Sequence, residues 1–370
     1  MILLSLIITL LYAFLLLSFI IGFDKVSRFK LKKTELKTNF SIIIPFRNEA
    51  ENLPQLLDSL NNLDYPKELF EILMVDDESE DKSVEIIKKI SIRVSILNNN
   101  RTSNSPKKDA ITTAILKAKH SWIVTTDADC ILPKKWLQNL NAFILGNKVE
   151  MVCGPVNYIQ PKNFLERFQQ LELMSLMSAT IGGFGLQKPF MCNGANLAYS
   201  KALYEELNGF QGNNNIASGD DIFLLEKALN HDKSKVAFLK AQDSIVLTKP
   251  ASSFKQMVQQ RIRWASKSTH YKNGFGKLSG FLIFLMNALI LILFVLSIFK
   301  LVDFFILLYF FTAKFLLDLF LMLKMATFFN NKKLIYSYPL CSLLYPFFSV
   351  FIVVNSVFTS YEWKGRHFRK

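Results

Sequence analysis

The sequence predicts an α/β domain built on a parallel sheet, with membrane-spanning helices before and after it along the chain. Two observations lead to this prediction. Residues 2–22 are an unbroken apolar run and residues 279–358 are apolar with short polar interruptions, whereas about 20 apolar residues suffice to cross a bilayer as a helix. Between these runs, short apolar β-rich stretches alternate with helix-like segments, which is typical of parallel strands joined by helices.

The alternation predicts where the strands and helices of this domain lie. We expect strands at residues 40–45, 70–75, 93–97, 122–126 and 149–153. We expect helices at residues 50–60, 79–90, 109–119 and 134–143. The pattern resembles a Rossmann-type nucleotide-binding fold, in which ligands bind at the carboxyl ends of the strands.

Changes of composition predict how the chain is divided. In order, we expect a transmembrane anchor at 1–22, a basic linker at 23–38, the α/β domain at 39–248, an amphipathic segment at 249–277, about three transmembrane helices at 278–360 and a basic tail at 361–370. Apolar residues recur at helical spacing in 164–177 and 254–262. This spacing predicts two amphipathic helices, each packed either on a core or at a membrane interface.

The positive charges predict the orientation of the chain. No basic residue precedes the first apolar run, no small-residue cleavage site follows it, and a basic stretch at 25–37 comes directly after it. We therefore expect an uncleaved anchor with a cytosolic flank, in a multi-pass protein of the cell (inner) membrane whose α/β domain is cytosolic. The net charge is +14, but basic residues cluster at membrane edges (25–37, 332–333 and 364–370), which favours anionic lipid headgroups over nucleic acid.

Cysteine and glycine spacing argues against two kinds of site. The cysteines are Cys130, Cys153, Cys192 and Cys341. They show neither zinc-ligand spacing nor a disulfide framework, so we expect reduced thiols. The glycines at 182–185 have no predicted strand before them and no Lys-Ser/Thr pair after them, and we interpret them as a turn rather than a phosphate loop.

One acidic pair directly follows a predicted buried strand. Asp127 and Asp129 stand two residues apart after the strand at 122–126. Carboxylate oxygens suit a hard divalent cation, whose coordination is commonly completed by substrate phosphates. A solvated aspartate-rich turn is the alternative, and the position at a strand end favours the metal site.

Two further acidic pairs stand where a carboxylate can do chemistry or cap a helix. Asp76 and Asp77 follow the strand at 70–75, where one carboxylate can accept hydrogen bonds from a base or ribose. Asp220 and Asp221 open a helix far downstream, where a carboxylate can accept a proton from an attacking hydroxyl. Helix capping is the alternative for both pairs.

Lys314 and Asp318 form a charged pair within the apolar run 302–323. Charges at that depth in a bilayer cost a few kcal/mol each unless they are compensated. A spacing of four residues places both side chains on one helical face, so we expect them to pair and to face protein rather than lipid.

Together these features resemble the family 2 glycosyltransferases over nearly the whole chain. The matching motifs, in the family's order, are Ser-Ile-Ile-Ile-Pro-Phe-Arg-Asn-Glu at 41–49, Val-Asp-Asp at 75–77, Lys-Lys-Asp-Ala at 107–110, Thr-Asp-Ala-Asp at 126–129, Asn-Gly-Ala-Asn at 193–196, Gly-Asp-Asp at 219–221 and Gln-Gln-Arg-Ile-Arg-Trp at 259–264. The last contains the Gln-x-x-Arg-Trp pattern. The resemblance implies a GT-A-like domain, a nucleotide-sugar donor, Mg²⁺ or Mn²⁺, and inversion at the anomeric carbon.

The resemblance also implies roles for individual residues. The residues that it assigns to the donor are Pro45, Glu49, Asp77, Lys108, Asp127, Gln260, Arg263 and Trp264. Asp129 shares the metal with Asp127, and Asp221 is the general base, with Asp220 beside it. Two departures stand out: the lysine pair at 107–108 lacks its usual glycine, and Asp220 stands where the family often has glutamate.

The end of the chain indicates the acceptor. Trp363-Lys364-Gly365-Arg366 looks like the Trp-x-Gly-Arg ending of family members that glycosylate membrane lipids, with a plain basic membrane flank as its alternative. We therefore expect transfer from a UDP-sugar to a lipid or lipid-linked acceptor. A processive β-polysaccharide synthase, which shares Gln-x-x-Arg-Trp, and a non-catalytic membrane scaffold are the alternatives.

Overall fold

The computed structural model describes residues 2–90, 92–214, 216, 218–267, 270–359, 361–363 and 366–368, which form two compact units. The helical unit comprises Met1–Val26, Gln160–Phe190 and Pro250–Lys370. The sheet unit comprises Ser27–Ile159 and Met191–Lys249. The segment 160–190 therefore packs with the helical unit, although it lies inside the range expected for the α/β domain.

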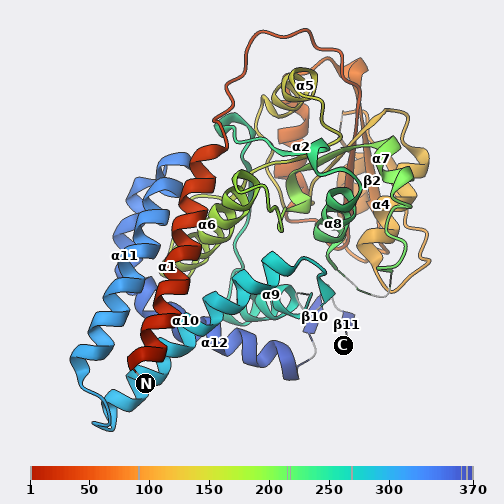
Figure 1. Ribbon diagram of the computed structural model, residues 1–370. Coiled ribbons are helices and arrows are strands. Elements are labelled where there is room, and N and C mark those ends of the chain that lie inside the picture. The colour runs from red at the N-terminus through yellow and green to blue at the C-terminus, as the bar shows by residue number, and fades with distance from the viewer. Residues whose placement is uncertain are drawn as a thin grey trace. The chain divides into compact units, whose positions relative to one another are not determined.

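A mostly parallel sheet forms the centre of the sheet unit (Figure 1). In the described part of the chain it has seven strands in the order β3-β2-β1-β4-β7-β5-β8. The strands are β1 (Phe40–Phe46), β2 (Phe70–Asp76), β3 (Ser95–Asn98), β4 (Trp122–Thr125), β5 (Met151–Cys153), β7 (Leu197–Ser200) and β8 (Val236–Phe238). In β1, the side chains of Ile42, Ile43 and Ile44 are fully buried, as expected of an inner strand of a parallel sheet.

One strand of this sheet runs against its neighbours. β7 pairs antiparallel with β4 and β5, whereas the β1–β2, β2–β3, β1–β4 and β5–β8 pairs are parallel. The predicted parallel sheet is therefore confirmed for most of the strand pairs, whereas β7, which lies outside the predicted strands, runs antiparallel to both of its neighbours. An apolar run has the same pattern in both directions, so periodicity detects a strand without reporting the direction of its chain.

Two smaller sheets are also present. β6 (Val156–Tyr158) pairs parallel with β9 (Val246–Thr248). In the helical unit, β10 (Tyr361–Trp363) pairs antiparallel with β11 (Arg366–Phe368). The Trp-x-Gly-Arg pattern spans their connection, and its residues 364 and 365 lie outside the described residues.

Short helices connect the strands of the sheet unit. They are α2 (Leu53–Asn61), α3 (Ser83–Lys88), α4 (Pro106–Lys117), α5 (Trp136–Gly146), α7 (Lys201–Glu206) and α8 (Asp220–Asp232), with 3-10 turns η1 (Lys67–Leu69), η2 (Gly194–Asn196), η3 (Lys233–Lys235) and η4 (Gln242–Ser244). α4 begins at Pro106 rather than at the predicted residue 109, because the fixed φ of proline suits the first turn of a helix. Lys107 and Lys108 therefore lie in this first turn.

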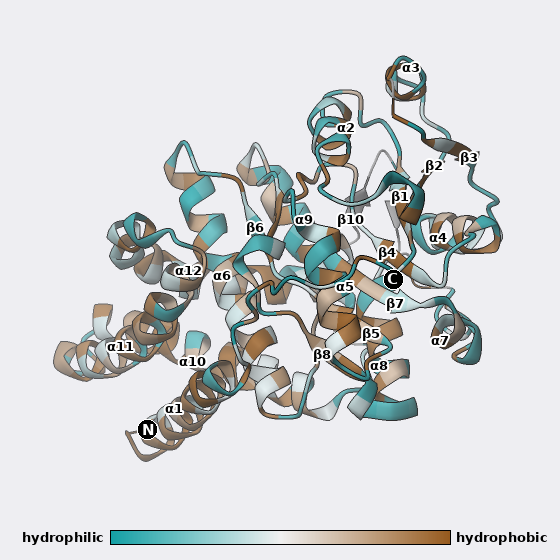
Figure 2. Cartoon of the chain, turned by 90° about the horizontal axis from the view of Figure 1, so that it is seen from above, coloured by the Kyte–Doolittle hydropathy of each residue, from teal (hydrophilic) through white to brown (hydrophobic). Residues whose placement is uncertain are grey.

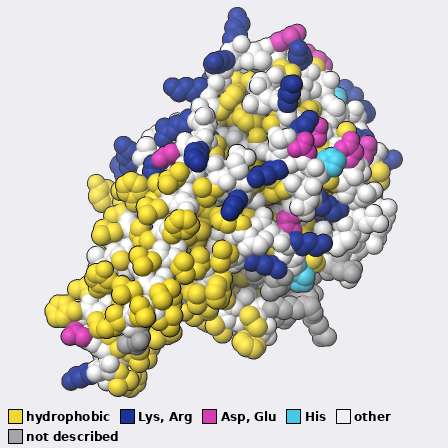
Figure 3. Space-filling view, in the orientation of Figure 1, with side chains coloured by type: hydrophobic (Ala, Val, Ile, Leu, Met, Phe, Trp, Pro, Cys, Tyr) yellow, Lys and Arg dark blue, Asp and Glu magenta, His cyan; other side chains and the backbone are white. Residues whose placement is uncertain are grey.

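The helical unit carries the apolar segments of the chain. Within the described residues, four helical segments are long and apolar enough to cross a membrane: α1 (Ile2–Lys25), α10 (Gly274–Ile298), α11 (Phe304–Phe328) and Lys332–Phe358, which joins η6 (Lys332–Ser337) to α12 (Tyr338–Phe358). Figure 2 shows that these helices are largely hydrophobic, and Figure 3 shows hydrophobic side chains across their visible face. Phe14 and Phe305 are 75% and 74% exposed, which suits contact with lipid rather than water.

α6 (Phe164–Gly185) and α9 (Phe254–Lys267) complete the long helices of this unit. In α6 both the apolar stripe, such as Phe168 and Met174, and the intervening Gln169 and Gln170 are buried. α6 is thus enclosed by protein, and of its two predicted alternatives the core helix is confirmed.

Glycines bring α1 and α6 into backbone contact. A Cβ atom at Gly22 would overlap the carbonyl oxygen of Gly182, and one at Gly185 would overlap the carbonyl oxygen of Gly22. The interpretation of residues 182–185 as a turn is therefore wrong, since they are helical. Small residues are used here for close helix approach, as is common between membrane helices.

The charged pair within the apolar run lies inside the helical unit. Lys314 is 1% exposed, and its Nζ lies 2.5 Å from Oδ2 of Asp318. The hydroxyl of Tyr12, in α1, donates to Asp318, and the ring of Tyr345, in α12, lies 5.7 Å from the Lys314 ammonium. The predicted pairing of the two charges against protein is confirmed.

We expect Gly22→Ala to destabilise the helical unit, because its methyl group would overlap the backbone of α6. Overpacking of this kind typically costs about 1–3 kcal/mol. Gly280→Ala in α10 is the matched control: a Cβ there meets nothing within 4 Å, so the better helix propensity of alanine should leave stability unchanged or slightly raised. Thermal unfolding in detergent measures both variants, and equal melting temperatures would contradict the close packing.

Candidate active site

Asp127 and Asp129 leave the sheet at the carboxyl end of β4. The amide of Thr126 donates to the carbonyl of Ile43 (3.2 Å), which keeps the chain beside β1 up to that point. The chain then turns, with the amide of Cys130 donating to the carbonyl of Asp127 (3.2 Å). The Asp127 side chain is 36% exposed, so its carboxylate remains accessible to solvent.

Lys107 lies between two of the predicted carboxylates. Its Nζ is 2.6 Å from Oδ1 of Asp127 and 3.3 Å from Oδ2 of Asp220. Burial alone would lower the pKa of Lys107, but the charges of Asp127 and Asp220 outweigh it and hold this pKa well above its ordinary value. Lys107 is therefore a fixed cation at physiological pH, and it joins the first turn of α4 to the start of α8.

Lys108, the lysine predicted to contact the donor, points elsewhere. It is 1% exposed, and its Nζ donates to the backbone carbonyls of Asn213 (2.7 Å) and Ile216 (2.9 Å). The same ammonium lies 4.8 Å from the ring centre of Phe223 in α8. These contacts anchor the chain before α8, whereas Lys107, which sequence reasoning left without a role, is the lysine among the carboxylates.

Asp220 and Asp221 occupy the first turn of α8 after Gly219, whose φ of 86° requires the left-handed region that glycine tolerates. Oδ2 of Asp221 accepts the amide of Gly194 (3.1 Å), and Oδ1 accepts the amide of Ile222 (2.8 Å). A Cβ at Gly194 would lie 3.0 Å from Oδ2 of Asp220. Gly194 thus allows both carboxylates to approach the backbone of η2.

The Asn-Gly-Ala-Asn motif holds that backbone in place. Asn193 accepts the amide of Ala195 (3.0 Å) and so caps η2. The buried amide of Asn196 donates to the carbonyls of Pro155 and Ser244, each at 2.8 Å, and accepts from the indole of Trp136 (2.9 Å). The motif therefore fixes the amide that binds Asp221.

Asp77 lies at the carboxyl end of β2, on the same edge of the sheet as Asp127. It is 6% exposed, and its Oδ1 accepts from Nδ2 of Asn99 (2.6 Å) and lies 3.7 Å from Nη1 of Arg101. Asp109 in turn accepts from the amides of Thr102 (3.1 Å) and Ser103 (3.0 Å). Asn99 and Arg101 are thus site-forming residues that sequence reasoning did not identify, because their loop has no periodic pattern, and Asp109 of α4 holds that loop in place.

Pro45 and Glu49 lie at the corresponding end of β1. Pro45 pairs in register with Val75 of β2. The amide of Glu49 donates to Oγ of Ser83 (2.8 Å), and its Oε2 accepts from Nδ2 of Asn52 (2.5 Å). The Glu49 side chain is therefore fixed at the start of α2 beside the β1–β2 edge.

The remaining predicted residues, Gln260, Arg263 and Trp264, lie on α9 of the helical unit. They are partly buried there. Gln260 accepts a hydrogen bond from Arg261, whose guanidinium also lies 4.4 Å from the ring centre of Trp264. The structure thus groups Gln260 and Trp264 around Arg261, a residue that the Gln-x-x-Arg-Trp pattern leaves unspecified.

The carboxylates that follow β4 are of the kind that suits a hard divalent cation whose remaining ligands are phosphate oxygens of the substrate. Among the residues that the structure describes, no group of three or more His, Cys, Asp or Glu side chains could hold a metal ion. Asp127 and Asp129 carry carboxylate oxygens of the kind that such a cation prefers, and a cation held by these two residues would draw its other ligands from phosphates and water, as Mg²⁺ commonly does. Burial and the charges of Asp129 and Asp127 raise the pKa of the Cys130 thiol well above its ordinary value, which disfavours a thiolate ligand.

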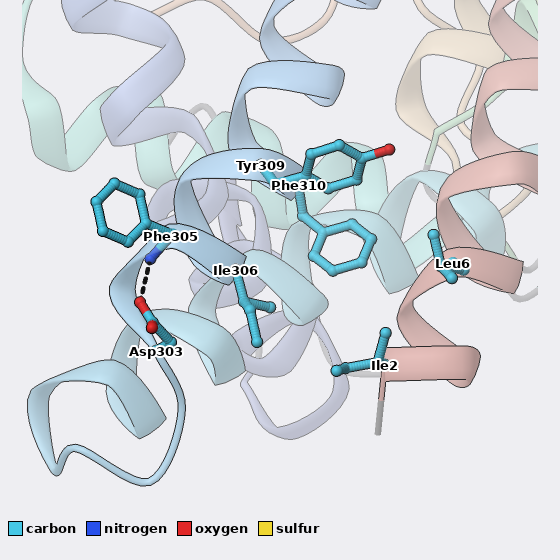
Figure 4. A pocket seen from close by; sticks show the side chains of 7 residues that line it. All are labelled: Ile2, Leu6, Asp303, Phe305, Ile306, Tyr309 and Phe310. Carbon is cyan, nitrogen blue, oxygen red and sulfur yellow. Dashed lines mark hydrogen bonds between the residues drawn. The ribbon is translucent and has the colours of Figure 1, made fainter.

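A hollow in the helical unit does not have the features of a donor site. It measures about 340 Å³ and is lined mainly by apolar residues, among them Leu6, Ile306 and Phe310 (Figure 4). Its acidic residue, Asp303, accepts the amide of Phe305 (2.9 Å) and so caps α11. An apolar hollow with one acidic group would repel a nucleotide diphosphate.

The chain resembles known glycosyltransferases in sequence. Residues 41–207 match the protein family described as Glycosyl transferase family 2. Glycosyltransferase AglE of Haloferax volcanii is 26% identical over 228 residues, which cover 60% of this chain and 70% of AglE. A Methanococcus voltae enzyme, dolichyl N-acetyl-α-D-glucosaminyl phosphate 3-β-D-2,3-diacetamido-2,3-dideoxy-β-D-glucuronosyltransferase, is 32% identical over 101 residues, covering 27% of this chain and 32% of the enzyme.

A solved structure supports the fold. The mannosyltransferase PcManGT of Pyrobaculum calidifontis, solved with GDP-Man and Mn²⁺, has a TM-score of 0.53 and 15% identity and aligns over 96% of each chain. The mixed, mostly parallel sheet agrees with the family 2 match. The chain carries a Glycosyl transferase family 2 domain with a GT-A-like mixed α/β sheet and is a glycosyltransferase.

Proposed function

We propose that this glycosyltransferase moves a sugar from a nucleotide-sugar, preferably a UDP-sugar, to a lipid or lipid-linked acceptor, with inversion. The observation that carries the proposal is the cluster in which Lys107 bridges Asp127 and Asp220 while the amide of Gly194 holds Asp221. Carboxylates at a strand end suit a metal–diphosphate, and a carboxylate at a helix start suits a base. The same arrangement argues against a scaffold without catalysis, which has no need of it.

In this proposal the donor lies along the carboxyl edge of β1, β2 and β4. Pro45, Glu49 and Asp77 contact the nucleoside, with Asn99 and Arg101 orienting the Asp77 carboxylate. Asp127 and Asp129 would hold Mg²⁺ or Mn²⁺, which would neutralise charge on the diphosphate. Lys107 replaces Lys108 as the lysine that we assign to the diphosphate, because its ammonium lies beside Asp127.

Asp221 is the general base of the proposed reaction. The acceptor hydroxyl gives its proton to Asp221, its oxygen bonds to the anomeric carbon, and the bond to the nucleoside diphosphate breaks with its electron pair on the leaving group. The amides of Gly194 and Ile222 fix the Asp221 carboxylate, whereas the Asp220 carboxylate lies 3.3 Å from the Lys107 ammonium and is engaged in that ion pair. Gln260, Arg263 and Trp264 contact donor and acceptor, and Arg263 offers charge to the diphosphate.

Three features support a lipid acceptor in the cell membrane. The helical unit has four segments able to span a bilayer among its described residues, which suits access to a lipid substrate. The name of the Methanococcus voltae relative specifies a dolichyl-linked sugar phosphate. The basic stretch after α1 includes the exposed residues Arg28, Lys30 and Lys32, which by the positive-inside rule favours a cytosolic sheet unit.

We expect wild-type protein to convert an α-linked UDP-sugar and membrane lipid extract into an organic-soluble, β-linked glycolipid. Asp221→Asn should lose transfer by a factor on the order of 100 or more while nearly keeping donor affinity, since a base acts mainly in the transition state. Mass spectrometry quantifies the glycolipid, NMR assigns its anomeric linkage, and calorimetry measures the donor affinity of wild type and variant. Polymeric product would favour the processive synthase, and full turnover by Asp221→Asn would move the base elsewhere, with Asp220→Asn as the first comparison.

Donor turnover should require Mg²⁺ or Mn²⁺ and fall on the order of 100-fold or more in Asp129→Asn, because loss of a metal ligand removes far more than a surface charge. Asp58→Asn, at an exposed position of α2, is the matched control and should keep full activity. Turnover in excess chelator and Mn²⁺ binding followed by electron paramagnetic resonance are the measurements. Unchanged transfer without divalent cation would contradict the metal assignment.

The two neighbouring lysines should differ in their effects. Lys107→Met removes the cation between Asp127 and Asp220 and should lower kcat/KM on the order of 100-fold. Lys108→Met instead leaves the carbonyls of Asn213 and Ile216 without their donor and should mainly lower the melting temperature. The opposite result would assign the donor contact to Lys108: Lys108→Met would lose turnover at an unchanged melting temperature, and Lys107→Met would keep its turnover.

A further inference from the structure

Arg261 lies within the Gln-Arg-Ile-Arg-Trp segment of α9. Its guanidinium is buried, and its charge is paired with a carboxylate of the protein. Its side chain is 3% exposed, and Nε and Nη2 lie 2.9 Å and 2.7 Å from Oε2 of Glu172 on α6. The Glu172 side chain is 9% exposed. Nε donates to this oxygen and Nη2 lies beside it, so the buried carboxylate holds the guanidinium in place.

The same guanidinium contacts two residues of the motif. Nη1 of Arg261 donates to the side-chain oxygen of Gln260. Its Cζ lies 4.4 Å from the ring centre of Trp264, three residues further along α9, where helical spacing brings side chains together. The Arg261 guanidinium therefore contacts both Gln260 and Trp264, and Glu172 of α6 holds this guanidinium in turn.

We propose that Arg261 is a positioning residue that presents Gln260 and Trp264 to donor and acceptor, with Glu172 orienting its guanidinium. This inference rests on the proposed function, which gives Gln260 and Trp264 those contacts. A displacement of about 1 Å in a side chain that positions substrate is able to lower the rate of the catalysed reaction on the order of 100-fold. Arg261 can therefore affect sugar transfer without contacting the substrate.

Stability alone is a weak reason for this ion pair. An apolar pair of similar volume commonly stabilises a protein as well as, or better than, a buried ion pair does. Arg261→Met/Glu172→Leu is therefore the informative variant, since it removes the orienting group without leaving a buried unpaired charge. The matched control is Lys324→Met/Asp24→Leu, which removes another ion pair of the helical unit (2.7 Å) between α11 and α1.

Two measurements on full-length protein in detergent test the proposal. The first is the ¹⁹F NMR signal of 5-fluorotryptophan at position 264, assigned with Trp264→Phe and recorded without substrate. The second is steady-state sugar transfer together with UDP binding. We expect Arg261→Met/Glu172→Leu to shift or broaden the Trp264 signal and to lower kcat by about 10- to 100-fold, with UDP affinity unchanged. The control pair should change neither measurement.

A sharp, unshifted Trp264 signal with kcat within about twofold of wild type would overturn the proposal. If the apolar double variant does not fold, Arg261→Lys takes its place, because it keeps a cation for Glu172 but lacks the planar group for Gln260 and Trp264. Wild-type-like behaviour of Arg261→Lys in both measurements would equally overturn it. If wild type transfers no sugar, the proposed function fails, while the ¹⁹F signal still decides whether Arg261 orders Trp264.

Discussion

The ammonium group of Lys107 is the contact on which the geometry of the candidate site depends. It lies 2.6 Å from Asp127 and 3.3 Å from Asp220, and so links the first turn of α4, the turn after β4 and the start of α8. Two carboxylates that share one ammonium are close to each other, and without this cation they would repel each other in a partly buried environment. The proline that starts α4 sets where this lysine stands, so a local backbone preference positions the central charge of the site.

Much of the sheet unit was predictable because its strands are apolar, short and followed by acidic residues. β1, β2 and β4 begin at the predicted residues, and Asp77 and Asp127 lie at their carboxyl edge as expected of parallel strands. The direction of β7 was not predictable, since an apolar run carries no sign of its chain direction. The residues around Asp77, namely Asn99 and Arg101, come from an irregular loop, where contacts depend on the final fold rather than on spacing.

Lys107 and Lys108 show what a motif alone leaves undecided. Successive residues of a helix point about 100° apart, so the register of α4 decides which lysine faces the carboxylates and which faces Phe223 and the 213–216 carbonyls. The pairing of Lys314 with Asp318 was predictable because both lie on one helix at a spacing of four. The Tyr12 hydroxyl that completes it comes from α1, and tertiary packing alone brings it there.

The charges of the sheet unit give a physical reason for the proposed use of a divalent cation. Lys107 lies beside two carboxylates, those of Asp127 and Asp220, and a nucleotide diphosphate is itself an anion. In the proposed function, a donor at this edge would add further negative charge, and Mg²⁺ or Mn²⁺ held by Asp127 and Asp129 would offset it. Because Lys107 already engages Asp127, a cation held by Asp127 would compete with that contact and would leave the ammonium available to the diphosphate. The lysine between the carboxylates of the free protein would then also be the lysine that stabilises the leaving group.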